Sequence, residues 1–272
     1  MLVKKIELSE GAYLDVYVTD PIKHEKKRRP LLVIPGGGYS KVCAFKEGEP
    51  IAFAFIPYGY NAFVLHYTVG RVKPFPCQLI EAARAIKHIK DNAEEYNVDP
   101  DELFVVGFSA GGHLAASTGV LWKLDEVYEA VDMPYGYNKP KGIMTIYPVI
   151  SPKLERHIAS FKNLWCSDTP AEEDLQRSAI EDHVDADSSP AFIMHTAGDQ
   201  LVDVRNSLML ADAYARAEIP FEMHIYPFGP HGMALANEQT SEGNPRKVDK
   251  TVAEWVRHAA VWADTMCRNE EK

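Results

Sequence analysis

Short runs of mostly apolar residues recur along the chain and alternate with longer segments in which apolar residues repeat every three or four positions. Such runs, bounded by glycine, proline or polar residues, are typical of strands buried on both faces of a sheet. They occupy residues 31–34, 62–65, 103–106, 142–147, 191–195 and 221–226. An alternating segment at 5–19, with Glu10-Gly11 near its centre, predicts a hairpin ahead of them.

Four segments between and after these runs have the period of a helix. The first opens after Pro76 and places Leu79, Ala82, Ala83 and Ile86 on one face. The other three lie at residues 110–122, 205–217 and 250–266. Strands that alternate with helices predict a mostly parallel central sheet with right-handed crossovers and helices on both faces. The fold class expected is therefore a three-layer α/β fold.

The length of 272 residues suits one α/β domain, so we expect a single domain over residues 1–272. Residues 151–189 break the alternation of strands and helices, because they are polar and rich in Asp, Ser and Pro. Open α/β sheets bind ligands beyond the carboxyl ends of their strands. The segment is therefore predicted to be an insertion over the active site.

Composition and charge exclude several classes of protein. An apolar content of 46% and a charged content of 25% are those of a soluble globular protein. The net charge of -10 repels phosphate backbones and argues against a nucleic-acid partner. The sequence contains no stretch of about 20 apolar residues that could span a membrane, and its first residues lack the apolar core of a secretory signal. We expect a cytoplasmic protein.

A candidate nucleophile lies in the sequence Gly-Phe-Ser-Ala-Gly-Gly at 107–112. It follows the predicted strand 103–106 directly and precedes a predicted helix. Glycines on both sides of Ser109 allow a sharp strand-to-helix turn that leaves the serine exposed at its tip. The motif alone is common, but this setting makes it a specific sign of nucleophilic catalysis by Ser109.

A serine hydroxyl needs a base, and the base needs an orienting carboxylate. On this fold the acid follows the serine in the chain, and the histidine comes last. Asp199 and His231 both lie in glycine-containing loops just past predicted strands, so we assign them as acid and base. Asp203 is the competing acid, and His113 is expected to pack beneath the site rather than face Ser109.

Stabilisation of an oxyanion requires backbone N–H groups that point at the developing charge. The residue after the nucleophile, Ala110, supplies one donor. The sequence Pro-Gly-Gly-Gly-Tyr at 35–39 follows a predicted strand, and its Gly37 and Gly38 are the other candidates. A phosphate-binding loop is the alternative for this segment, but neither glycine-rich phosphate motif is present. No spacing of histidines suggests zinc, and no metal or cofactor is expected.

Taken together, these stretches resemble the α/β-hydrolase superfamily, and within it the esterase/lipase branch. The resemblance is strongest to acetyl esterases and to acetyl-xylan-esterase-like and feruloyl-esterase-like enzymes. It rests on the sequences at 34–40, 107–115, 195–202 and 228–232 and extends from about residue 30 to the end. Pro35 stands where the hormone-sensitive-lipase-like branch has histidine, and Val202-Asp203 replaces the usual Val-Pro of the acid loop.

The resemblance implies a serine carboxylic-ester hydrolase that acts on short-chain, acetyl esters, including those of sugars or xylo-oligosaccharides. It is compatible with a homodimer, since dimers are common among such enzymes. An arylformamidase-like amide hydrolase would share every motif, and a catalytically silent binding module is a further alternative. Tyr39, Tyr147 and Trp165 are candidate walls of the substrate pocket, with ordinary core packing as the other interpretation of each.

Overall fold

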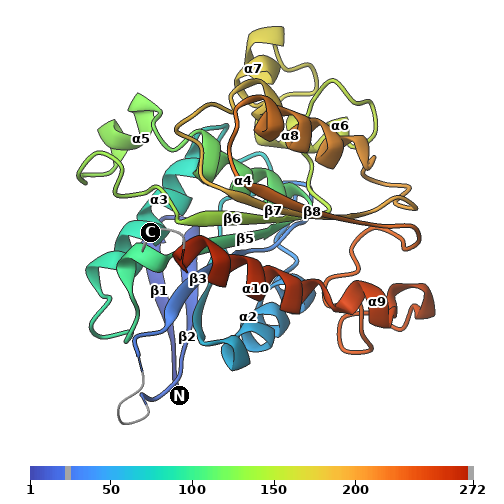
Figure 1. The fold of residues 1–272 in the computed structure, drawn as a ribbon. Coiled ribbons are helices and arrows are strands. Elements are labelled where there is room, and N and C mark those ends of the chain that lie inside the picture. Colours follow the sequence, from blue (N-terminus) through green and yellow to red (C-terminus); the bar gives the residue numbers. More distant parts are fainter. Residues whose placement is uncertain (22–25, 269–272) are drawn as a thin grey trace.

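A single eight-stranded sheet crosses the molecule in the computed structural model, which describes residues 1–21 and 26–268 (Figure 1). Its strands are β1 (Leu2–Ser9), β2 (Ala12–Val18), β3 (Arg29–Ile34), β4 (Tyr60–His66), β5 (Phe104–Phe108), β6 (Gly142–Ile146), β7 (Ala191–Thr196) and β8 (Phe221–Tyr226). They lie in the order β1-β2-β4-β3-β5-β6-β7-β8. All pairs from β4 to β8 are parallel, and β2 is antiparallel to both its neighbours. The predicted fold class is confirmed.

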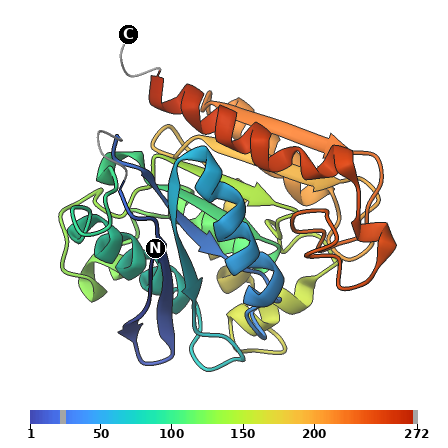
Figure 2. The same ribbon diagram turned by 90° about the horizontal axis from the view of Figure 1, so that it is seen from below.

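Helices cover both faces of this sheet. They are α1 (Ala44–Glu47), α2 (Glu49–Phe55), α3 (Cys77–Asp91), α4 (Ala110–Val120), α5 (Asp125–Ala130), α6 (Ile158–Leu164), α7 (Glu172–Arg177), α8 (Arg205–Arg216), α9 (Lys250–Ala253) and α10 (Trp255–Arg268). Short 3-10 turns lie at Ile56–Tyr58, Pro100–Glu102, Ile180–Asp182 and Pro245–Lys247. Helices α2 and α10 lie across one face (Figure 2), and α3, α4 and α8 pack on the other.

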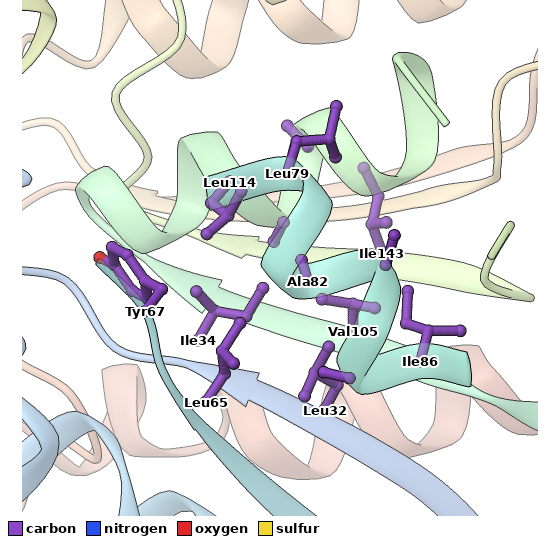
Figure 3. Close-up of a cluster of buried hydrophobic side chains, with 14 of the residues drawn as sticks. Leu32, Ile34, Leu65, Tyr67, Leu79, Ala82, Ile86, Val105, Leu114 and Ile143 are labelled. Carbon is purple, nitrogen blue, oxygen red and sulfur yellow. The ribbon is translucent and has the colours of Figure 1, made fainter. Parts of the chain in front are cut away.

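The apolar stripe predicted for the first helix forms the centre of the larger core. Leu79, Ala82 and Ile86 of α3 share one buried cluster with Leu32 of β3, Val105 of β5 and Leu114 of α4 (Figure 3). Each buried leucine or isoleucine stabilises the fold by about 1.5–3 kcal/mol relative to exposure. The packing of α3 and α4 against β3 and β5 therefore holds the loops that leave the carboxyl ends of these strands.

Two differences from the predicted elements have a local cause. Residues 44–55 form α1 and α2, although no helix was predicted there. The apolar residues of α2 continue into the apolar sequence of β4, so the pattern did not separate the helix from the strand. Pro50 at the start of α2 and a buried face of Ile51, Ala52 and Phe55 are the helical signals. The final helix is divided at Glu254 into α9 and α10.

The segment 151–189 folds into α6, α7 and the turn Ile180–Asp182. Helix α6 reaches the loop that follows β3, since the Asn163 side-chain amide donates a hydrogen bond of 2.8 Å to the carbonyl of Gly38. Across the residues that the structure describes, no helix is both long and apolar enough to cross a membrane.

Candidate active site

Ser109 occupies the turn between β5 and α4 and has the unusual backbone angles φ 54° and ψ −119°. Its N–H donates a 3.0 Å hydrogen bond to the carbonyl of Ile146, which fixes the turn to the neighbouring strand. The flanking positions have no room for a side chain. A Cβ on Gly107 would lie 2.1 Å from the Gly111 carbonyl oxygen, and one on Gly111 would lie 2.2 Å from the Ile34 carbonyl oxygen. The sequence therefore builds a strained turn that presents the serine side chain.

The structure brings Ser109, His231 and Asp199 into one chain of hydrogen bonds. His231 Nε2 lies 2.9 Å from Ser109 Oγ, and His231 Nδ1 lies 2.6 Å from Asp199 Oδ2. A carboxylate accepts but does not donate, so Nδ1 carries the proton and Nε2 is left to accept from the serine hydroxyl. This is the arrangement in which a serine can be deprotonated as it attacks.

Asp199 is buried and has a hydrogen-bond donor at each oxygen. Oδ1 accepts from the N–H groups of Leu201 and Val202, both at 2.9 Å, and Oδ2 faces His231 and His195. Burial alone would raise the pKa of Asp199. Hydrogen bonds from His195 and His231 outweigh that effect and hold the pKa well below its usual range. The carboxylate is therefore charged wherever the protein is folded near neutral pH.

The competing candidates lie elsewhere. Asp203 forms an ion pair with Arg205 at 2.8 Å and makes no contact with His231. His113 is buried beneath the site, as expected, where Nδ1 accepts from the Tyr39 hydroxyl at 2.8 Å and Nε2 donates to the Ser178 carbonyl. Burial lowers the pKa of His113 to about 4, so it stays neutral.

His195 is a supporting residue that the sequence analysis did not assign. It is buried in β7, with Nε2 3.3 Å from Asp199 Oδ2 and Nδ1 2.8 Å from Ser207 Oγ. Nε2 also lies 3.2 Å from the Val202 carbonyl, so both of its neighbours are acceptors and this nitrogen carries the proton. The contact is local, since His195 lies four residues before Asp199, but no motif in the sequence marks it.

The loop after β3 brings backbone N–H groups to the serine. Gly37 and Gly38 have φ angles of 128° and 63°, which favour glycine, and both line the same pocket as Ser109. A Cβ on Gly37 would lie 2.1 Å from the carbonyl of Lys41, so no larger residue fits there. Among the described hydrogen bonds, none engages the N–H of Gly37, Gly38 or Ala110. The N–H groups of these three residues thus have no described hydrogen-bond partner within the protein.

The pocket beside Ser109 has a volume of about 400 Å³. The loop after β3, the start of α1, helix α6 and the loops around Asp199 and His231 form its walls. The lining residues are Gly37, Gly38, Ser40, Lys41, Cys43, Lys46, Glu47, Ser109, His157, Ala159, Ser160, Asn163, Leu201, His231 and Gly232. More than half of these residues have polar side chains, although more of the pocket surface is apolar than polar, and the segment 151–189 contributes four of them.

The three aromatic residues predicted as candidate pocket walls do not line this pocket. Tyr39 is buried with its hydroxyl bound to His113, and Tyr147 is buried with its ring 5.0 Å from that of His231. Trp165 packs against Phe75, 5.5 Å away between ring centroids, and donates to a serine hydroxyl. Tyr39 and Tyr147 are buried and Trp165 is partly buried, and their packing agrees with the core interpretation of each.

Within residues 1–21 and 26–268, no group of three or more His, Cys, Asp or Glu side chains is placed to hold a metal ion. The groups available at this site are a serine hydroxyl that is hydrogen-bonded to an imidazole, a carboxylate beyond the imidazole, and backbone N–H groups. Such a set can form and hydrolyse a covalent acyl intermediate.

Solved structures with this architecture cover nearly the whole chain. The acetyl ester-xyloside bifunctional hydrolase from Caldicellulosiruptor lactoaceticus is 31% identical, with a TM-score of 0.81 over 97% of this chain and 96% of that chain. The carboxylesterase Cest-2923 from Lactobacillus plantarum is 25% identical, with a TM-score of 0.83 over 97% and 98% of the two chains. Fold and relatives together define an α/β hydrolase of the esterase branch.

The model of the BD-FAE family matches residues 14–214, which is more than half of the chain, and the protein therefore belongs to the BD-FAE family. It is also 36% identical over 222 residues to endo-1,4-beta-xylanase B of Butyrivibrio fibrisolvens, a match that covers 80% of this chain and 34% of the xylanase. The chain spans between about a third and about half of the length of this xylanase and of three further curated relatives.

Proposed function

We propose that this protein is a serine carboxylic-ester hydrolase that removes short acyl groups, above all acetyl, from hydroxyl groups of sugars such as xylo-oligosaccharides. The observation that carries the proposal is the continuous chain of hydrogen bonds from Ser109 through His231 to Asp199, which opens into a small pocket. Membership of an esterase family and the names of the similar enzymes support ester hydrolysis on sugars.

In the acylation step, Ser109 Oγ attacks the ester carbonyl while His231 Nε2 takes the serine proton. The carbonyl oxygen becomes an oxyanion, which the N–H groups of Gly37, Gly38 and Ala110 stabilise. The imidazolium formed on His231 is stabilised by Asp199, which keeps its own charge. When the tetrahedral intermediate collapses, the C–O bond to the alcohol breaks, and His231 gives its proton to the leaving oxygen.

In the deacylation step, the same groups act on water. His231 Nε2 takes a proton from a water molecule, whose oxygen attacks the carbonyl of the acyl-enzyme. The second oxyanion forms in the same place, and its collapse breaks the bond to Ser109 Oγ, which regains a proton from His231. The products are a carboxylic acid and the free enzyme, and no other reactant is consumed.

The polar side chains in the pocket wall support the proposal that the alcohol part of the substrate carries further hydroxyl groups. His157, Ser160 and Asn163 of the segment 151–189 line the pocket together with Gly37 and Gly38. These two glycines belong to the loop after β3, residues 35–39, which we call the oxyanion loop. Burial, followed by the nearby His231, lowers the pKa of His157 to about 4, so the ring is neutral in the working range. His157 Nδ1 is bound to Ser160 Oγ at 2.6 Å, which leaves Nε2 to hydrogen-bond a substrate hydroxyl.

The proposal is tested with esters that differ in acyl length and in alcohol. We expect p-nitrophenyl acetate to be hydrolysed with at least about tenfold higher kcat/KM than the octanoate, because a pocket of about 400 Å³ gives a long chain little surface to bind. Acetylated xylobiose should release acetate. Preferential hydrolysis of an N-formyl aromatic amide over every ester would contradict the proposal and favour an arylformamidase.

A further inference from the structure

Glu47 is a buried acidic residue in the wall of the active-site pocket, and the reaction described above does not use it. Only 3% of the residue is exposed. Its Oε2 accepts a 2.8 Å hydrogen bond from the N–H of Gly36, and its Oε1 accepts a 3.1 Å hydrogen bond from the Tyr147 hydroxyl. Removing a carboxylate from water costs free energy. The two hydrogen bonds offset part of this cost, and each fixes a neighbouring segment in place.

The first hydrogen bond fixes the start of the oxyanion loop. Gly36 immediately precedes Gly37, and its carbonyl is held at 2.9 Å by the N–H of Cys43, one turn before Glu47. The contact is tight: a Cβ on Gly36 would lie 2.9 Å from Glu47 Oε2 and 2.9 Å from Ser109 Cβ. The carboxylate, the oxyanion loop and the nucleophile therefore meet at one point.

The second hydrogen bond leads to the loop of the catalytic base. The Tyr147 hydroxyl, which donates to Glu47, accepts a 3.0 Å hydrogen bond from the N–H of Ala234. The Tyr147 ring also packs edge-on against His231, with 5.0 Å between the ring centroids. Burial, and then the charge of Glu47, raises the pKa of Tyr147 far above its usual value, so the hydroxyl keeps the proton that it donates.

We propose that Glu47 is a positioning residue: through Gly36 and Tyr147 it sets the oxyanion loop and the His231 loop relative to Ser109. The proposal rests on the proposed function of the site. It assigns Glu47 no contact with substrate. Displacing a catalytic group by about 1 Å can cost about 100-fold in rate, so a residue that fixes two such groups at once affects the chemical step rather than substrate binding.

The variant Glu47→Gln tests this directly. Glutamine keeps the shape of the side chain, but once its oxygen accepts from the Gly36 N–H its NH₂ group faces the Tyr147 hydroxyl, whose proton then loses its acceptor. We expect kcat on p-nitrophenyl acetate to fall about 10- to 100-fold, with KM within about threefold of wild type. Tyr147→Phe removes the hydrogen bond between the Tyr147 hydroxyl and Glu47 from the tyrosine side. The kcat of the double variant should be no lower than that of Glu47→Gln alone.

A matched control is available in Glu81 of α3, a buried carboxylate outside the pocket. It accepts 2.8 Å and 2.5 Å hydrogen bonds from the N–H and the hydroxyl of Thr68. Glu81→Gln makes the same chemical change at a similar cost in stability. Its kcat at 25 °C should stay within about twofold of wild type, which separates positioning from a general loss of stability.

A second measurement does not depend on knowing the substrate. A fluorophosphonate forms a bond from phosphorus to Ser109 Oγ, fluoride leaves, and the serine proton passes to His231. Its labelling rate reports the same base and the same oxyanion donors. Glu47→Gln should slow labelling at least about tenfold. Labelling and kcat equal to wild type, or lowered only as much as in Glu81→Gln, would overturn the positioning role. If wild type is labelled rapidly but hydrolyses no ester, the proposed function fails, and the labelling rates still decide the role of Glu47.

Discussion

At the scale of single residues, the hydrogen bonds of Asp199 determine which nitrogen of His231 carries the proton. Its Oδ1 is taken up by two backbone N–H groups, and its Oδ2 faces the imidazoles of His231 and His195. The oxygen that faces His231 accepts a hydrogen bond from the Nδ1–H, which leaves Nε2 unprotonated toward Ser109. The carboxylate thus sets the direction of the hydrogen-bond chain, and the N–H groups of Leu201 and Val202 hold the carboxylate in place.

This arrangement predicts a large effect of Asp199→Asn. The asparagine oxygen will take the place of Oδ1, where two N–H groups need an acceptor, and its NH₂ group will then face His231. That orientation favours the tautomer with the proton on Nε2, which cannot accept from Ser109. We expect kcat on p-nitrophenyl acetate to fall about 10³- to 10⁴-fold with little change in fold.

The control for this prediction is Asp203→Asn, which removes an acidic group four residues further on that pairs with Arg205 instead. Its kcat should remain within about threefold of wild type. If the two variants lose activity equally, Asp199 is not the orienting acid.

The residues proposed to carry the reaction could be predicted from the sequence, while those that support them could not. Ser109, Asp199 and His231 each lie in a glycine-flanked loop next to an apolar strand, and these are local signals. Glu47 and His157 have no such context: each becomes part of the site only because distant segments pack together. Contacts between segments far apart in sequence are decided by the tertiary structure, and the period of apolar residues does not record them.

At the scale of elements, the loop after β3 joins two glycines that differ in the space around them. A methyl group on Gly37 would clash with the Lys41 carbonyl at 2.1 Å. A methyl group on Gly38 would meet no atom closer than the His157 ring at 3.5 Å. Both glycines have a positive φ angle, but only at Gly37 does a neighbouring backbone group leave no room for a Cβ.

We therefore expect Gly37→Ala to displace the loop and to reduce kcat at least about 100-fold. Gly38→Ala should fold with a loss of about 1–2 kcal/mol in the free energy of unfolding, which is the cost of the left-handed backbone. Steady-state kinetics and urea denaturation of both variants measure the difference. Equal stability and equal activity of the two variants would show that the loop is not held as described.

Helix α6 contributes a second constraint on the same loop through the hydrogen bond from Asn163 to the Gly38 carbonyl. Asn163→Ala should lower kcat/KM about three- to tenfold, because one side of the loop loses its support. Asn92→Ala, at the end of α3 and away from the pocket, is the matched control and should leave kcat/KM unchanged. Identical kinetics for both variants would mean that α6 does not restrain the loop.

The strands and most long helices follow from apolar periodicity because the sheet is buried on both faces. The hairpin of β1 and β2, with its turn after Ser9, follows from alternation. Helix α2 was missed because the apolar residues from Ile51 to Phe55 fit a buried helix as well as a strand. Helix α1, with four residues, is too short to show a helical period. This omission matters, since α1 carries Glu47.

At the scale of the whole molecule, buried neutral histidines link stability to pH. His113 is 1% exposed and has a pKa of about 4, lowered by burial from an unfolded value near 6.5. The folded state therefore binds this proton less readily than the unfolded state. Its contribution to stability is fully present above pH 6.5 and is lost as the pH falls toward 4.

We expect the free energy of unfolding to fall by about 1.4 kcal/mol per pH unit from His113 alone between pH 6.5 and pH 4. Urea denaturation at several pH values measures this slope. His113→Gln should be less stable at pH 7 but should show a shallower slope across that window. His183→Gln, at a partly exposed position, should keep the wild-type slope. Equal slopes for His113→Gln and wild type would contradict the buried neutral state.

The central claim is that Ser109 performs nucleophilic ester hydrolysis, and the most direct test compares wild type with Ser109→Ala on p-nitrophenyl acetate. Ser117→Ala, a buried serine further along α4 that donates to the His113 carbonyl, is the control. We predict rapid hydrolysis by wild type and by Ser117→Ala, and a loss of at least about 10⁴-fold in kcat for Ser109→Ala. Hydrolysis by Ser109→Ala at the wild-type rate, or no hydrolysis by wild type, would contradict the claim.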